Sequence, residues 1–190
     1  MMGRSFLSSL FPAIVLSLFG CFNPAPASAE ITHSFLGLGK ANQAVIVAED
    51  GTVEWKFEKP ASDGWVLPSG NVLLALYPTE GFPSGGVVEV ERESKKIVFQ
   101  YKGQQKEIST VQALSKGRFL VAELGPEPRA LVIDRNGDIL KSTPLQCQTS
   151  NFHMQTRMLR VLPNGNYIAP HLLDFAVKEY DPDTGKVLGT

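Results

Sequence analysis

The sequence predicts an all-β fold, a β-propeller built of four-stranded blades. The main observation is a Leu-x-x-Gly-x phrase that occurs three times, at spacings of 47 and 48 residues, and each copy precedes a short apolar run. The copies are Leu67–Asn71, Leu114–Arg118 and Leu162–Asn166. Self-similarity with a period of about 20 to 50 residues is typical of solenoids, propellers and repeat arrays. Beyond residue 29, no segment shows the i, i+3, i+4, i+7 periodicity of an amphipathic helix.

Four short stretches with strand character recur in each repeat, and the last repeat shows them clearly. In order they are Met158–Leu162, Tyr167–Ala169, Val177–Asp181 and Lys186–Leu188. Alternating or apolar runs of this length, separated by Gly, Asn, Asp and Pro, are typical of strands joined by tight turns. Four such strands within a repeat are the sequence signature of a propeller blade.

The repeats divide the chain into one partial blade and three further blades. The partial blade is expected at 30–57, where Ala41–Ala48 and Thr52–Phe57 have the character of the two outer strands. The following blades are expected at about 58–102, 103–143 and 150–190. The chain therefore holds about three and a half blades, whereas closed propellers have about four to eight. We predict a fragment of a larger ring, and completion of a short chain by self-association is the alternative.

The first 29 residues have the pattern of an export signal. Arg4 precedes an apolar stretch and a Pro-rich segment that ends in Ala27-Ser28-Ala29. This order predicts cleavage after Ala29 and a periplasmic or extracellular protein. The apolar stretch is short for a membrane span, so we expect no transmembrane segment after cleavage. The alternative is a lipoprotein anchored through Cys21, which follows Leu-Phe-Gly.

Charge and cysteine content narrow the classes of partner and site. Arg4 is the only charged residue in the signal segment, so cleavage leaves 17 basic against 19 acidic residues. This balance offers no basic stripe for a phosphate backbone, and a nucleic-acid partner is not expected. Cys147 is the sole cysteine after cleavage, which excludes an intrachain disulfide and a Cys-x-x-Cys site. No metal site is predicted.

The repeat resembles the bacterial quinoprotein-type, or PQQ-like, β-propellers over essentially all of residues 37–190. The segments that carry the resemblance are His153–Arg157, Leu162–Tyr167, His171 and Val177–Asp181. The Leu-Pro-Asn-Gly-Asn phrase is also similar to that of arylsulfotransferase-like propellers. The resemblance implies a propeller fold, and it suggests pyrroloquinoline quinone (PQQ) as a cofactor.

Two features of the quinoprotein dehydrogenases are missing from this chain. After cleavage only Trp55 and Trp65 remain, so the sequence has no tryptophan-docking signature. It also has no adjacent cysteine pair of the kind that those enzymes hold against the quinone. The resemblance therefore supports the fold more than the cofactor, which stays unassigned.

Polar residues gather where the innermost strands are expected to enter the central channel. Aligning the Leu-x-x-Gly-x phrases places His153 just before an innermost strand and Arg157 at its start, and it aligns His171 with Glu123 on the second strands. Five side chains are therefore expected near one mouth of the channel: Glu107, Glu123, His153, Arg157 and His171.

These residue types suit ligand binding. Arginine offers a planar fork for carboxylate, sulfate or phosphate groups. Histidine exchanges protons near neutral pH, which makes His153 and His171 the candidate catalytic residues. The alternative for each is structural: His153 completes a strand-entry loop, Arg157 pairs with Glu107 to join neighbouring blades, and His171 bonds between blades.

Three functions remain open on the sequence alone. The first is a secreted binding module whose polar channel mouth takes a small ligand or a protein partner. The second is a PQQ-like or metal-assisted enzyme that uses His153, Arg157 and His171. The third is arylsulfotransferase-like group transfer, with a histidine nucleophile and Arg157 holding the sulfate.

Overall fold

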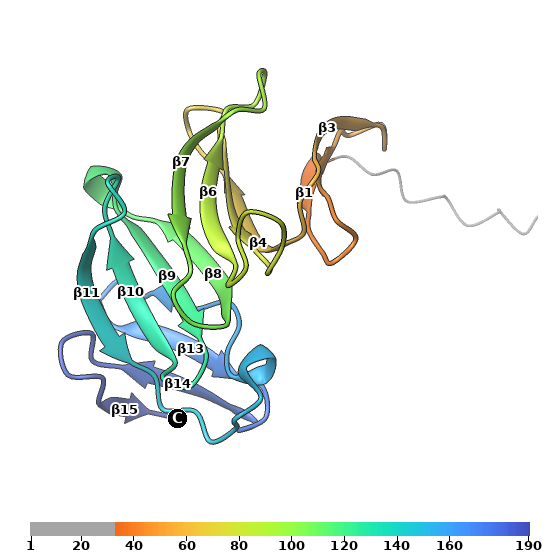
Figure 1. Cartoon of the computed structure of the whole chain (residues 1–190). Coiled ribbons are helices and arrows are strands. Elements are labelled where there is room, and N and C mark those ends of the chain that lie inside the picture. The colour runs from red at the N-terminus through yellow and green to blue at the C-terminus, as the bar shows by residue number, and fades with distance from the viewer. Residues whose placement is uncertain (1–32) are drawn as a thin grey trace, which may run out of the picture. The chain divides into compact units, whose positions relative to one another are not determined.

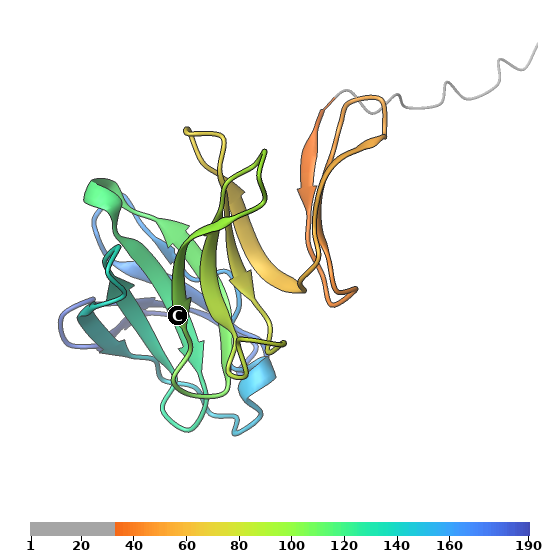
Figure 2. The ribbon, with the colours of Figure 1, turned by 45° about the horizontal axis from the view of Figure 1, so that its top comes forward.

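Three four-stranded antiparallel sheets and one three-stranded sheet make up the fold. The structure is a computed structural model that describes residues 33–190, so the predicted signal segment and Cys21 lie outside the described residues. In every sheet the strands pair in chain order. Figures 1 and 2 show the sheets following one another in chain order, from the orange first sheet to the blue fourth. The predicted all-β fold, a partial β-propeller, is confirmed.

The strands of the first two sheets have these bounds. The first sheet contains β1 (Phe35–Gly37), β2 (Ala44–Val47) and β3 (Val53–Phe57). The second sheet contains β4 (Ala61–Val66), β5 (Val72–Leu76), β6 (Gly86–Val90) and β7 (Ile97–Lys102).

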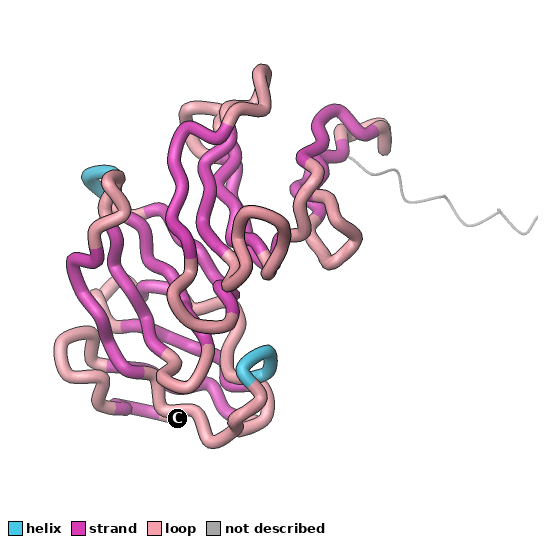
Figure 3. The backbone as a smooth tube through the Cα atoms, in the orientation of Figure 1, coloured by secondary structure: helices cyan, strands magenta, loops and turns pink. Residues whose placement is uncertain are grey.

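The third and fourth sheets repeat the same plan. The third contains β8 (Glu107–Ala113), β9 (Phe119–Leu124), β10 (Arg129–Ile133) and β11 (Ile139–Pro144). The fourth contains β12 (Arg160–Val161), β13 (Tyr167–His171), β14 (Ala176–Tyr180) and β15 (Val187–Gly189). Two single-turn 3₁₀ helices lie in connections, η1 (Ser115–Gly117) and η2 (Phe152–Met154) (Figure 3). Among the described residues, no helix is long and apolar enough to cross a membrane.

The first sheet has one strand more than the two that the sequence predicted. β1 pairs with β2 in the register Phe35↔Val47. A three-residue strand that ends at Gly37 shows no alternation in the sequence, and its pairing with β2 becomes evident only when the chain folds back. Leu36 of β1 then packs against the core between the first and second sheets.

The repeated phrase forms the turn between the first two strands of its sheet. In the first copy the Leu67 amide donates to the Asn71 carbonyl and the Gly70 amide donates to the Leu67 carbonyl, both at 2.8 Å. Gly70 has a φ of +87° and the matching Gly165 a φ of +90°. Residues with a side chain rarely adopt a backbone conformation in this left-handed region, which explains why glycine recurs at this position.

Consecutive sheets pack face to face through three apolar clusters. Along β5, Val72, Leu74 and Leu76 face the first sheet, while Leu73 and Ala75 face the third. Side chains of a strand alternate between its two faces, so an apolar run buried on both faces belongs to a sheet between two others. The cluster between the third and fourth sheets is built on Leu120, Ala122, Tyr167, Ala169 and Tyr180.

Candidate functional site

The candidate site lies at the end of the sheets where β4 and β8 begin and β5 and β9 finish, which we call the entry end. Glu107 is the first residue of β8, and its side chain is only 4% exposed. One carboxylate oxygen of Glu107 lies 2.8 Å from Nδ1 of His153, and the other lies 2.9 Å from Nη2 of Arg157. The third sheet and the connection that leads into the fourth sheet therefore meet at this carboxylate.

Short local structure brings His153 and Arg157 to Glu107. His153 lies in η2, and the Arg157 amide donates to the Pro170 carbonyl just before β12 begins. Arg157 also donates from Nη1 to the carbonyl of Thr156, which holds the guanidinium close to its own backbone. The cation is thus fixed in place by backbone and carboxylate together.

Proton positions in the cluster follow from the chemistry of its groups. A carboxylate can only accept, so Nδ1 of His153 donates to Glu107 in their 2.8 Å contact. Nη2 of Arg157 lies 2.7 Å from the same nitrogen, but it too is a donor, so its proton goes to the other carboxylate oxygen. Nε2 of His153 lies 3.3 Å from the same guanidinium nitrogen, a longer contact than the one at Nδ1.

A shallow hollow of about 290 Å³ opens beside this cluster. Lys40, Asn42, Pro60, Tyr77, Pro78 and Glu107 line it. The Tyr77 ring lies 5.9 Å from the His153 ring, and Nζ of Lys40 lies 5.4 Å from the Tyr77 centroid. Burial raises the pKa of Tyr77 and outweighs the lowering effect of the Arg157 charge, so the Tyr77 hydroxyl stays protonated near neutral pH. The hollow thus combines an aromatic face, a cation and a carboxylate.

The structure brings together three of the five residues predicted from the sequence: Glu107, His153 and Arg157. Glu123 is fully buried and forms an ion pair with Arg129, whose Nη2 lies 2.7 Å from its carboxylate. Glu123 also accepts a hydrogen bond from the Gln104 amide. A buried carboxylate whose oxygens are occupied by these partners has a structural role.

His171 lies in a different environment, buried between the connector before the fourth sheet and β14. Its Nδ1 lies 2.9 Å from the Gln155 carbonyl and 3.2 Å from Sγ of Cys147, and its Nε2 lies 2.7 Å from the Tyr180 hydroxyl. A carbonyl only accepts, so Nδ1 donates to Gln155 and Nε2 accepts from Tyr180. Burial lowers the pKa of His171, which keeps the ring neutral.

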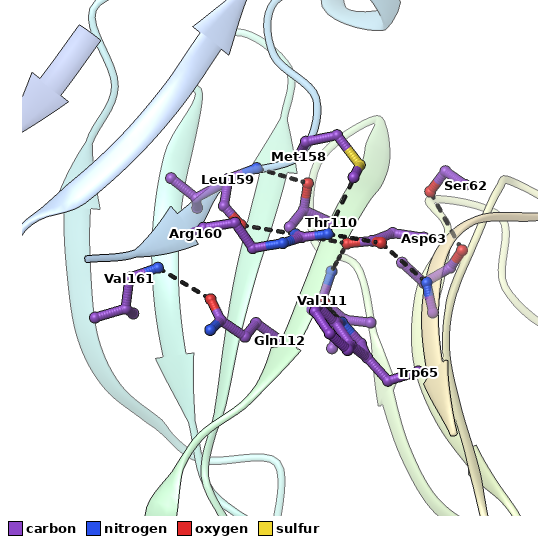
Figure 4. A network of polar contacts seen from close by, with 12 residues as sticks. Ser62, Asp63, Trp65, Thr110, Val111, Gln112, Met158, Leu159, Arg160 and Val161 are labelled. Atoms are coloured by element: carbon purple, nitrogen blue, oxygen red, sulfur yellow. Dashed lines mark hydrogen bonds and ion pairs between the residues drawn. The ribbon is translucent and has the colours of Figure 1, made fainter. Parts of the chain in front are cut away.

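Sequence reasoning missed an ion pair that joins the second and fourth sheets. Nη1 and Nη2 of Arg160 donate to the two oxygens of Asp63, at 2.9 and 3.0 Å (Figure 4). The Arg160 guanidinium also lies 5.1 Å from the Trp65 ring centroid. The two residues are 97 positions apart, so no local pattern connects them.

A repeated pattern of hydrogen bonds between the innermost strands holds this pair in place. Asp63 accepts from the Val111 amide, and Thr110, at the matching position of the next strand, accepts from the Leu159 amide. Gln112 likewise accepts from the amide of Val161 (Figure 4). Polar side chains at matching positions of β4 and β8 therefore tie each innermost strand to the next. Two partial recurrences before the repeated turn could have revealed this: Asp63 and Thr110 stand four residues before it, and Gln112 and Arg160 two residues before it.

The residues of the site do not fit PQQ. The quinone carries several carboxylates, but the Arg157 guanidinium is already paired with Glu107, which itself lines the hollow. Lys40 is the only cation among the residues that line this hollow. No group of three His, Cys, Asp or Glu side chains able to hold a metal ion occurs within residues 33–190.

Comparison with known proteins supports the fold. The sequence matches no protein-family model and no curated protein. A crystal structure of a protein of unknown function from Bacteroides caccae has a TM-score of 0.69 and 21% identity, over 81% of this chain and 55% of that one. The WD40 β-propeller domain of Doa1 has a TM-score of 0.60 and 14% identity, over 82% of this chain and 49% of that one.

These similarities are structural. The chain spans about half the length of each of these two solved structures. At such low identity the likeness shows a propeller fold and carries neither the PQQ-like nor the arylsulfotransferase-like specificity.

Proposed function

We propose that this protein is a binding module of the β-propeller type and that its entry end takes a small ligand with a carboxylate and hydroxyl groups. The observation that carries the proposal is the Glu107–His153–Arg157 cluster beside the Tyr77 hollow. Propeller folds provide many binding surfaces, but the site has to supply the chemistry. A buried carboxylate that lines a hollow and is held in place by two basic groups can anchor a polar ligand.

The lining of the hollow supports the class of ligand. A volume of about 290 Å³ is at the small end of ligand pockets and suits a molecule the size of a monosaccharide. The Tyr77 ring offers an apolar face for a sugar ring, and Glu107 accepts from hydroxyl groups. Arg157 neutralises Glu107, so Lys40 leaves a local excess of positive charge that favours an acid.

Titration of the protein with glucuronate and with glucose, followed by calorimetry and by NMR of the side chains, tests this proposal. We expect glucuronate to bind more tightly than glucose and to shift the signals of Tyr77 and His153. Lys40→Met should weaken glucuronate binding about tenfold, which corresponds to about 1.4 kcal/mol. It should leave glucose binding unchanged.

A matched control is Lys102→Met. Lys102 also lies over an aromatic ring, with Nζ 5.8 Å from the Phe82 centroid, but it does not line the hollow. Equal losses in the two variants would mean that overall charge, rather than the hollow, attracts the acid. Absence of binding by both sugars would contradict the proposed ligand class.

We also propose that the protein acts outside the cytoplasm. The support is the order of Arg4, an apolar stretch and Ala27-Ser28-Ala29 in the sequence. Intact-mass analysis of the protein from an exporting bacterial host should give a chain that starts at Glu30. A chain that starts at an acylated Cys21 would favour the lipoprotein alternative, and an uncleaved chain in the cytoplasm would contradict export.

A further inference from the structure

The face of the fourth sheet that points away from the third is apolar and partly exposed. Ile168 and Pro170 of β13 alternate with the buried Tyr167 and Ala169, so they lie on this outer face. Val177 of β14 pairs with Pro170 and is 50% exposed. We call Ile168, Pro170 and Val177 the outer face of the fourth sheet.

The matching residues of the two preceding sheets are covered. Alignment on the repeated turn places Ile168 with Leu73 and Leu120, which are both fully buried. Leu73 packs in the cluster between the second and third sheets, and Leu120 in the cluster between the third and fourth. Ile168 itself is only partly buried, although the following sheet covers the matching residue of both preceding sheets.

A glutamate on this face also has a counterpart in the second sheet. Glu89 of β6 accepts from Asn71 at 2.7 Å, and Glu179 of β14 accepts from Asn166 at the same distance. Asn71 and Asn166 are the last residues of the repeated phrase. Hydrogen bonds from Asn166 and Asn164 lower the pKa of Glu179, so this carboxylate is charged near neutral pH.

The two carboxylates differ in their remaining partner. Glu89 is paired with Arg135 of the third sheet, whose Nη2 lies 2.6 Å from its second oxygen. No ion pair to Glu179 forms within the described part of the chain. In the second sheet, therefore, the covering sheet supplies a cation, and the fourth sheet presents the same anion without one.

A second copy of this chain would bring the wrong charge to Glu179. Arg135 lies in the β10–β11 turn, where the Asp134 amide bonds the Asp138 carbonyl and the Gly137 amide bonds the Asp134 carbonyl. The β2–β3 turn has the same two bonds, from Ala48 to Thr52 and from Gly51 to Ala48. Glu49 therefore occupies the place of Arg135, and head-to-tail packing of the first sheet on the fourth would oppose two carboxylates.

We propose that the outer face of the fourth sheet is a docking surface for one further antiparallel β-sheet of the blade type. This sheet carries an arginine or lysine where the third sheet carries Arg135. The apolar residues supply the contact area, and the cation over Glu179 selects the partner against sheets such as the first, which places glutamate there.

Fusion of a suitable sheet to the full chain tests this surface. A second copy of residues 103–144 joined after Thr190 supplies the arginine, and it contains no cysteine. Val177→Cys, introduced in the fusion and in the unfused chain, reports on coverage through its rate of reaction with Ellman's reagent. We expect the fusion to react at least tenfold more slowly than the unfused chain.

The matched control is the same fusion with the appended copy carrying the change that corresponds to Arg135→Glu. It should react as fast as the unfused chain. Circular dichroism and sedimentation of each protein establish that it is folded and show its oligomeric state.

Three results would overturn the proposal. Equal reaction rates with and without the appended sheet would mean that the face does not accept a blade. Equal protection by the charge-reversed control would mean that Glu179 selects nothing. A dimer of the unfused chain in which Val177→Cys is protected would mean that the occupant is a second copy.

Discussion

His153 and His171 both lie in the last blade, residues 150–190, and each forms close polar contacts, yet their surroundings differ. His153 is half-buried and donates to the Glu107 carboxylate, and the only contact of its second nitrogen within the described residues is the 3.3 Å one to Arg157. His171 is only 1% exposed, and both of its nitrogens are occupied by Gln155 and Tyr180. The comparison teaches that the partners and burial of a polar residue, rather than its type, decide whether it can bind a ligand.

Removal of the His171 ring should have the largest effect on stability. His171→Ala leaves a cavity in a buried site and removes the 2.7 Å hydrogen bond from the Tyr180 hydroxyl, so we expect a loss of about 3 kcal/mol in the free energy of unfolding. Urea denaturation followed by fluorescence measures this loss. The matched variant His153→Ala should lose less than about 1 kcal/mol, because its ring is partly hydrated already.

His171→Phe separates packing from hydrogen bonding in the same experiment. It restores most of the volume but neither bond, so its loss should fall between zero and that of His171→Ala. If His153→Ala proved as destabilising as His171→Ala, the distinction between a site histidine and a structural histidine would fail.

Glu107 should give the next largest effect. Glu107→Ala leaves the Arg157 guanidinium, 17% exposed, without its carboxylate, and we expect a loss of about 2 kcal/mol. Glu107→Gln keeps the shape and one acceptor and should lose less. Both variants should abolish the binding of glucuronate, as measured by calorimetry. Unchanged binding by folded Glu107→Ala would remove Glu107 from the site.

The pH dependence of stability should follow His171. Burial lowers its pKa in the folded protein, whereas an unfolded histidine takes up its proton near a pH of about 6.5. The unfolded chain therefore binds more protons as the pH falls below about 6.5, and the free energy of unfolding decreases there. Above about 6.5 this contribution to stability is fully present.

Urea midpoints at pH 7.5 and 5.5 check this dependence. The decrease should be smaller in His171→Asn than in the wild-type protein, because the titrating group is gone. His153→Asn serves as the control and should keep the wild-type decrease from His171. A variant at position 171 with an undiminished decrease would assign the pH dependence to other groups.

The smallest expected effect concerns Cys147, whose Sγ contacts His171. Burial raises the pKa of the Cys147 thiol to about 11, and its neighbour His171 is neutral. The thiolate is the reactive form, so Cys147 should react much more slowly with iodoacetamide at pH 8 than a free cysteine does. Unfolding in urea should restore the ordinary rate. Fast alkylation of the native protein would show that the surroundings of Cys147 open.

Part of the candidate site could be predicted from the sequence because the repeat sets the register. Aligning the Leu-x-x-Gly-x phrases placed His153 just before an innermost strand, Arg157 at its start and Glu107 nearby. The structure joins these three, although β12 begins only at Arg160. The same alignment put Glu123 and His171 on matching second strands, but it could not show that Arg129 and Tyr180 occupy them. Register predicts which end of a sheet a residue reaches, and it leaves open which neighbour its side chain meets.

By itself the sequence determined the all-β class, the repeated turn and the four-strand pattern. These depend on local rules, since glycine is needed at a positive φ and side chains alternate along a strand. Only the tertiary structure decided the pairing of β1 with β2, the Asp63–Arg160 ion pair and the different roles of His153 and His171. Each of these depends on burial and on partners brought together from separate parts of the chain, and no local rule contains that information.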